Sequence, residues 1–372
     1  MDHRINKHAK VLINYSLQLK LGETVLISTD ISCLKLANEV YREALKAGAH
    51  PQIKIDSNEL QEIFLKNATS KQLSFHHENE LTNVKTFDAF ITLIGSENTR
   101  ALTSIDTKRQ KLRMQSGKDI ADIYQDRMRA KEIRWVGTMY PTSGFAMDAN
   151  MSLSEFEEFV YDACLLNDDD PISAWEKIEA QQEKICKFLN TKSRIRFVSD
   201  ETDISMNIKG RTWVNCCGKV NFPDGEVFTG PVEDSVEGFI KFSYPAIFQG
   251  KKIENVRLRF DKGKVVEATA DKGEEFLLEI LDTDPGARFV GEIAIGTNYG
   301  IDRLIKHMLF DEKIGGTIHL ALGRSIPGSG GVNSSLIHWD MLCDMRKDGK
   351  IYADDELIYK NGNFIIDQEL SR

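Results

Sequence analysis

The sequence predicts two domains, an α/β domain over residues 1–190 with a mostly parallel sheet and a sheet-rich α+β domain over residues 191–372. Three observations predict this division. The chain has 372 residues, which is more than one small core requires. Its first half alternates apolar strand segments with helical segments, as parallel sheets do. After Lys192 the apolar residues alternate with period two, which is typical of antiparallel strands.

In the first half, the spacing of apolar residues predicts the helices and strands, and glycine, proline and capping residues indicate where helices begin and end. Helical spacing of apolar residues predicts helices, continuous apolar runs predict buried strands, and Gly22 and Gly48 end two of the helices. Thr69-x-x-Gln72 and Ser152-x-x-Glu155 match capping boxes, and Pro171 suits a first helical position. The expected order is helix 5–19, strand 23–28, helix 34–45, strand 51–55, strand 88–94, helix 106–132, strand 133–138, helix 152–165 and helix 171–189.

The second half predicts strands joined by short polar turns. Alternation over 194–198 and 203–208, with Asp200-Glu-Thr between them, predicts a hairpin. Further strands are expected at 238–242, 256–260 and 264–268, followed by a helix over 272–281.

Composition excludes several classes of function. The formal net charge of −9, without a block of Lys and Arg, argues against nucleic acid as a partner. No apolar run approaches the ~18 residues of a membrane span, so no membrane partner is expected. The six cysteines show no CxxC spacing, and the charged N-terminus does not resemble a signal peptide. These features predict reduced thiols and a cytoplasmic location. The chain has neither GxGxxG nor GxxxxGK[ST], so nothing indicates a nucleotide.

Polar residues interrupt apolar strand segments between Val290 and Asp340. Glu292 is expected on one strand face with Val290 and Ala294, and His319 lies within a second apolar run. His338 and Asp340 are two apart, so on a strand both side chains point the same way. Burying an ionised carboxylate is costly unless it is paired or binds a metal. The segment therefore predicts a divalent metal centre, although a hydrogen-bonded core histidine and a metal-free His–Asp pair remain alternatives.

Glu226 is a further candidate ligand. The turn Pro223-Asp-Gly225 delivers it to the start of an apolar strand, where an exposed turn carboxylate is the simpler alternative. With Glu226 the set holds two Glu, two His and one Asp, which exceeds the need of one four-coordinate zinc. Such a carboxylate-rich set fits two ions at the ~3.5–4 Å spacing of two-metal hydrolases.

Four motifs resemble one known family. They are Phe222-Pro-Asp-Gly-Glu226-Val-Phe, Gly291-Glu-x-Ala-x-Gly-Thr-Asn298, Phe310-Asp-Glu-Lys-x-Gly-Gly-Thr-x-His319-x-Ala-x-Gly323 and His338-x-Asp340. In this order they look like the thermophilic aminopeptidases, the family of aminopeptidases T and S. The N-terminal segments Gly22-Glu-Thr-Val-Leu-Ile and Ala47-Gly-Ala49 are similar too. The resemblance covers essentially the whole chain.

The resemblance implies a homodimeric exopeptidase with two divalent ions, Zn, Co or Mg. The family's metal ligands then fall on Glu226, Glu292, His319, His338 and Asp340. The family also uses a tyrosine seven positions after the first histidine, where this chain has Ile326, and Tyr299 is a candidate substitute.

The sequence therefore predicts a metal-dependent aminopeptidase that acts on peptides with a free N-terminus through metal-activated water. Glu292 is expected to move the proton to the leaving amine. A second hypothesis is a ring-cleaving dihydroxypyridine dioxygenase, whose single Fe(II) would be held by His319, His338 and Asp340. The number of ions per chain distinguishes the two. A third hypothesis is a metal-free binding protein, suggested by Ile326.

Overall fold

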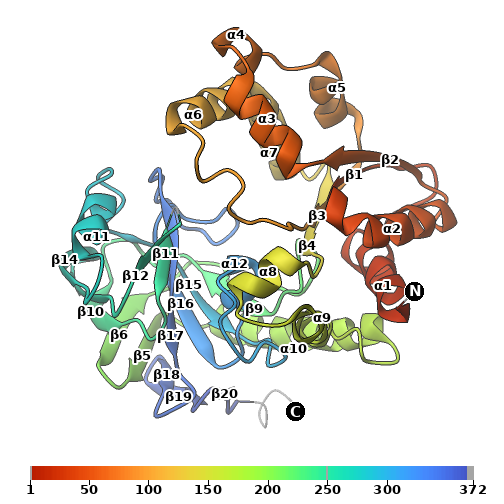
Figure 1. The fold of residues 1–372 in the computed structure, drawn as a ribbon. Helices are drawn as coiled ribbons and strands as arrows, with labels where there is room; N and C mark the ends of the chain where they lie inside the picture. Colours follow the sequence, from red (N-terminus) through yellow and green to blue (C-terminus); the bar gives the residue numbers. More distant parts are fainter. Residues whose placement is uncertain (1, 249, 367–372) are drawn as a thin grey trace. The chain divides into compact units, whose positions relative to one another are not determined.

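The computed structural model describes residues 2–248 and 250–366 (Figure 1). The chain divides into two compact units between Ala174 and Trp175, and the segment Gly218–Pro223 groups with the first unit. The helix that the sequence placed in the first domain, over residues 171–189, thus contributes most of its length to the second unit. The domain boundary at residue 190 stays a prediction.

The first unit contains a five-stranded parallel sheet in the order β2-β1-β3-β4-β8, as predicted. Continuous apolar runs form its central strands, whose side chains are largely buried. Its strands are β1 (Thr24–Asp30), β2 (His50–Asp56), β3 (Ala89–Ile94), β4 (Arg134–Met139) and β8 (Asn221–Phe222).

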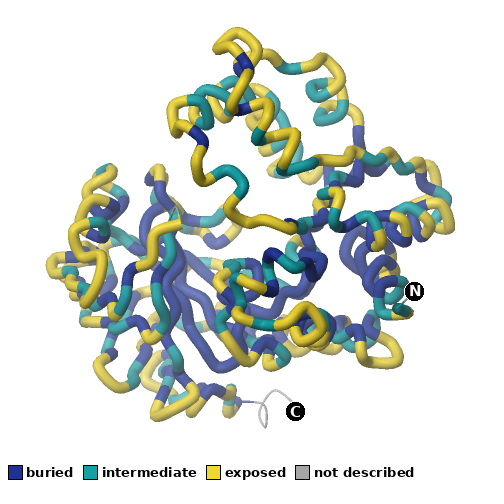
Figure 2. The backbone as a smooth tube through the Cα atoms, viewed as in Figure 1, coloured by how far each residue is buried: buried dark blue, intermediate teal, exposed yellow. Residues whose placement is uncertain are grey.

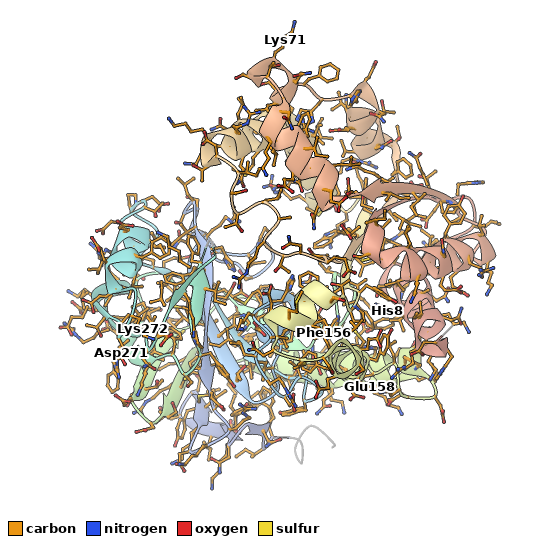
Figure 3. All side chains as sticks on the ribbon, viewed as in Figure 1. His8, Lys71, Phe156, Glu158, Asp271 and Lys272 are labelled. Carbon is orange, nitrogen blue, oxygen red and sulfur yellow. The ribbon has the colours of Figure 1, made fainter. Side chains whose placement is uncertain are left out.

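Helices connect these strands, and several begin where the sequence predicts. The capping boxes at Thr69 and Ser152 are both formed. His8 (labelled in Figure 3) is buried, and its Nε2 lies 2.8 Å from the Thr138 hydroxyl. The helical segments are α1 (His3–Lys10), the π-helical η1 (Val11–Ser16), the 3₁₀ turn η2 (Ile31–Cys33), α2 (Leu34–Lys46), α3 (Asn58–Asn67), α4 (Ser70–Leu73), α5 (Glu78–Thr86), α6 (Thr107–Ser116), α7 (Lys118–Arg129), α8 (Ser143–Asp148), α9 (Leu153–Ala163) and α10 (Pro171–Leu189).

The prediction of one long helix over residues 106–132 is wrong. Helices α6 and α7 are separated at Gly117, whose backbone leaves the helical region. A Cβ at Gly117 would lie 3.4 Å from the His76 ring, so the chain approaches this ring closely there. Figure 2 shows these helices as mostly exposed or half-buried. Neither has a buried residue, so core packing does not stabilise one continuous helix. Helical spacing alone did not reveal the break, because glycine lowers helix stability without excluding a helix.

The second unit is sheet-rich, as predicted. The hairpin of β5 (Arg194–Ser199) and β6 (Thr202–Asn207) lies within an eight-stranded sheet in the order β14-β13-β10-β6-β5-β18-β19-β20. The other strands of that sheet are β10 (Glu237–Lys241), β13 (Arg257–Asp261), β14 (Lys264–Thr269), β18 (Lys350–Ala353), β19 (Glu356–Lys360) and β20 (Asn363–Phe364). A smaller hairpin joins β11 (Ala246–Phe248) and β12 (Lys251–Ile253), and the helices are α11 (Glu274–Leu281) and α12 (Met308–Asp311).

A five-stranded antiparallel sheet in the order β17-β16-β15-β9-β7 carries the candidate site. Its strands are β7 (Val214–Cys216), β9 (Glu226–Thr229), β15 (Val290–Gly296), β16 (Thr317–Gly323) and β17 (His338–Asp344). The last three lie side by side in Figure 1, and Figure 2 shows them as buried. Apolar residues of one face, such as Ile293, Leu320 and Met341, join the large hydrophobic core of the unit. This packing fixes which face the intervening residues occupy.

Candidate metal centre

Strand register brings all five predicted ligands to one face of the antiparallel sheet. Glu226 pairs with Gly296 on the neighbouring strand, and His319 pairs with Ala294. Glu292 and Asp340 both pair with Ala321, and His338 pairs with Gly323. Each ligand therefore has glycine or alanine directly opposite on one neighbouring strand, and on the other His319 pairs with Leu342 and Glu226 with Cys216. These small residues leave room on this face for the five longer side chains, while the other face packs in the core.

A β-bulge in β15 orients Glu292. Val290 pairs with Leu322, whereas Glu292 pairs with Ala321, so Gly291 is the extra residue. Val290 belongs to the core, which corrects the expectation that it shares a face with Glu292. A Cβ at Gly291 would lie 2.2 Å from the Gly323 carbonyl oxygen, so only glycine fits this close approach.

The five residues form two groups of potential ligands that share Glu292. The first contains Glu226, Glu292 and His319, and the second contains Glu292, His338 and Asp340. In each group the ligand atoms lie within 4.8 Å of one another. His319 Nε2 is 3.5 Å from Glu226 Oε2 and 3.7 Å from Glu292 Oε1. His338 Nε2 is 3.3 Å from Glu292 Oε2 and 3.4 Å from Asp340 Oδ1. The two oxygens of Glu292 thus face different histidines.

The residues present fit divalent cations. Glu226 Oε2 and Asp340 Oδ1 are buried and have no hydrogen-bond partner among the described residues. Both atoms instead lie near histidine nitrogens, with Asp340 Oδ1 4.0 Å from His319 Nε2. A buried carboxylate oxygen without a partner is costly, and coordination removes that cost. Imidazole and carboxylate are also the donors that Zn and similar ions take in catalytic sites.

His338 is held in one orientation by the backbone. Its Nδ1 donates to the Arg324 carbonyl oxygen at 2.7 Å, which leaves Nε2 to face Glu292 and Asp340. A hydrogen bond of this kind fixes the tautomer of a metal-binding histidine.

The charges of the site shift its pKa values in opposite directions. Burial would raise the pKa of Glu292, but the favourable interactions with the nearby His319 and His338 outweigh burial and lower that pKa to about 2. Burial would lower the pKa of His338, yet the nearby carboxylates of Asp340 and Glu292 raise it to about 11. Burial raises the pKa of Glu226 to about 8, against the opposing charge of Lys313. The clustered carboxylates therefore favour positive charge at the histidines.

Sequence reasoning gave no role to Lys313, which the structure joins to the site. Its side chain is 1% exposed, and its ammonium contacts Glu226 Oε1 together with Glu312 Oε1 at 2.8 Å and Asp224 Oδ1 at 3.3 Å. Cys216, Asp224 and Glu226 also have potential ligand atoms close together, but the Lys313 ammonium already supplies the positive charge there. The sequence feature that could have indicated this role is the position of Lys313 just before the fully buried strand β16. The polar residues around Lys313 are equally typical of a solvated turn.

Ile326, at the position of the family's tyrosine, and Tyr299, its candidate substitute, lie in different loops. Ile326 is half-buried in the loop after β16, where its carbonyl oxygen accepts from the Ser329 hydroxyl at 2.7 Å. The hydroxyl of Tyr299 donates to the Gly362 carbonyl oxygen at 2.8 Å. The Tyr299 hydroxyl is thus engaged with the backbone of the turn before β20.

Carboxylates and histidines that converge in two groups on a sheet face are typical of metal-dependent hydrolases. Comparison with known proteins agrees, because residues 1–364 match the family described as thermophilic metalloprotease (M29). The chain belongs to this family, so the resemblance and the prediction of a metal-dependent peptidase are confirmed.

Individual relatives agree with the family. The chain is 26% identical to "Aminopeptidase AmpS" of Bacillus subtilis (strain 168), over 98% of each chain. Its fold matches the structure of wild-type AmpT from Thermus thermophilus with a TM-score of 0.84 and 24% identity, over 97% of this chain and 99% of the other. A more distant match is 2,5-dihydroxypyridine dioxygenase from Pseudomonas putida KT2440, with a TM-score of 0.57 and 12% identity over 99% and 98% of the chains. That likeness shows a shared fold alone.

Proposed function

We propose that this chain is an aminopeptidase that removes N-terminal residues from peptides, with two divalent ions held by Glu226, Glu292, His319, His338 and Asp340. The observation that carries the proposal is the pair of ligand groups that share Glu292. Because its two oxygens face different histidines, Glu292 would contribute to both ligand groups. Zn, Co and Mg are the ions we propose.

Bound divalent ions supply a polarised peptide carbonyl and a water molecule of lowered pKa. The chain's own residues position these components. The Arg324 carbonyl oxygen orients His338, and Lys313 holds one oxygen of Glu226 so that the other faces His319. Hydrolysis also moves a proton from water to the leaving amine, and we propose Glu292 for this transfer. Carboxylates beside the ions would hold the free α-amine, which restricts cleavage to the N-terminal residue.

The cellular setting is part of the proposal. All six cysteines are free thiols, which supports a reducing, cytoplasmic environment. Among the helices of residues 2–248 and 250–366, none combines the length and apolar character that crossing a membrane requires. The formal net charge of −9 supports peptides rather than nucleic acid as partners. We also propose a homodimer, following the family resemblance.

The decisive experiment combines metal analysis with a substrate pair. Protein purified without chelator should contain two divalent ions per chain and hydrolyse aminoacyl anilides. EDTA should abolish this activity, and Zn²⁺ or Co²⁺ should restore it. N-acetylated substrates should be inert, because they lack the free amine. The variant Glu292→Gln should bind neither ion tightly, since Glu292 belongs to both ligand groups. Full activity of metal-free protein, or equal cleavage of acetylated and free substrates, would refute the proposal.

The dioxygenase hypothesis predicts a different result in the same experiment. It requires one Fe(II) held by two histidines and a carboxylate. In the structure each histidine instead belongs to its own group, with His319 beside Glu226 and His338 beside Asp340. One iron per chain together with oxygen-dependent ring cleavage would favour the dioxygenase.

A further inference from the structure

A small cavity of about 120 Å³ opens beside the candidate metal centre, within the second unit. Asp340, a proposed ligand, forms part of its wall. The cavity therefore adjoins a residue of the candidate metal centre.

The remaining wall is mainly apolar and comes from separate elements. Ile247 belongs to β11, Met308 to α12 and Leu342 to β17, and Leu304 lies in the loop before α12. Ile247, Leu304 and Met308 are each only half-buried. These side chains leave apolar surface that a ligand group could cover, which would contribute about 25 cal/mol per Å² removed from water.

Two charged residues also line the cavity, and neither gives it a clear preference for charge. Asp311 is 3% exposed, and its Oδ1 accepts from the Ile305 N–H at 2.7 Å. The carboxylate thereby fixes the loop that carries Leu304. Lys306, an exposed residue of the same loop, also lines the cavity. A ligand group that enters the cavity meets chiefly hydrocarbon.

The size of the cavity suits an aliphatic side chain. A closed apolar cavity of ~150 Å³ holds a benzene ring, and the volume here, about 120 Å³, is somewhat smaller. Branched or linear chains such as those of Leu and Met match this volume, whereas large aromatic rings exceed it.

We propose that this cavity receives the side chain of the substrate's N-terminal residue and selects medium-sized aliphatic residues, Leu and Met above all. The inference rests on the proposed aminopeptidase function and adds the substrate class. The α-amine and scissile carbonyl would lie at the metal centre beside Asp340, and the side chain would extend between Leu304, Met308 and Ile247. The apolar wall then contributes to binding in proportion to the hydrocarbon it covers.

The test measures kcat/KM of the metal-loaded enzyme for anilides of Leu, Met, Ala, Phe, Lys and Glu. Because one methylene in an apolar pocket is worth roughly 10-fold or more, Leu and Met should exceed Ala by at least about 10-fold. The variants Leu304→Ala and Ile247→Ala should lower the Leu/Ala ratio of kcat/KM by about 10-fold and raise the Phe/Leu ratio. A ratio compares two substrates on the same enzyme, so a general loss of activity cancels.

Leu278→Ala is the matched control, because Leu278 is 38% exposed on α11 and does not line the cavity. It should leave both ratios unchanged. A preference for Lys would overturn the inference, because Asp311 would then select the side chain. The inference would also be overturned if the Leu/Ala and Phe/Leu ratios of kcat/KM changed equally in Leu304→Ala, Ile247→Ala and Leu278→Ala. If no aminoacyl substrate is cleaved at all, the aminopeptidase proposal itself fails, a result distinct from active enzyme with the wrong selectivity.

Discussion

Replacing Lys313 with methionine tests whether the buried ammonium organises the site. Lys313→Met keeps most of the side-chain volume and removes the charge. The Lys313 side chain is 1% exposed, and its ammonium lies among Asp224, Glu226 and Glu312. Breaking a buried ion pair by removing one partner costs about 3–5 kcal/mol, because the remaining charges are left uncompensated. That loss is a large part of the ~5–15 kcal/mol that stabilises a typical domain.

The measurement is urea unfolding in the presence of EDTA, so that lost metal binding does not contribute. Tryptophan fluorescence reports mainly on the second unit, because three of the four tryptophans lie in it, namely Trp175, Trp213 and Trp339. The free energy of unfolding of that transition should fall by about 3–5 kcal/mol in Lys313→Met. The control Lys187→Met removes a lysine that is 73% exposed, and it should change this free energy by less than about 0.5 kcal/mol.

A double-mutant cycle identifies the cause of the loss. Glu226→Gln removes one contact of the ammonium, so its effect should not add to that of Lys313→Met. A coupling of about 1–3 kcal/mol is expected for residues in one charge network. If Lys313→Met lowers the free energy of unfolding by less than about 1 kcal/mol, the carboxylates are compensated in another way. The positioning role given to Lys313 is then wrong.

Three further predictions concern the ligands, the loop after β16 and the acid stability of the first unit. His338→Ala and Asp340→Asn should each reduce bound metal from two ions to one and abolish turnover, since both residues lie in the same ligand group. Circular dichroism should stay native-like. Unchanged metal content and turnover would show that the two residues are structural. Ile326→Tyr should keep the fold and raise kcat, by up to about 10²–10³-fold if the phenol donates to the developing oxyanion; unchanged kcat with normal metal content would show that the tyrosine is dispensable. Burial lowers the pKa of His8 to about 3, so the unfolded chain binds a proton below pH 6.5 that the folded chain excludes, and stability falls as the pH falls. The loss between pH 6.5 and 4.5 should be about 2 kcal/mol larger in wild type than in His8→Gln, measured by urea unfolding at each pH. Equal losses would contradict a neutral buried His8.

Local sequence determined which face of its strand most of the ligands occupy. The spacing of His338 and Asp340 places both on one face of any strand, because side chains alternate with period two. The apolar residues between ligands, such as Ile318 and Trp339, likewise determined which face packs in the core. These properties depend on neighbouring residues only, so they could be predicted without knowing which strands pair.

Only the tertiary structure decided how the strands pair and what lies between them. Glu226 meets Gly296 although 70 residues separate them in sequence, because β9 pairs with β15. The bulge at Gly291 shifted the register, which local alternation could not reveal. Lys313 lies in a polar turn before β16. Its ammonium contacts Asp224 and Glu226 because folding brings these distant carboxylates around it. Burial and the distances between charges are properties of the packed chain, and they determine what a lysine or a glutamate can do.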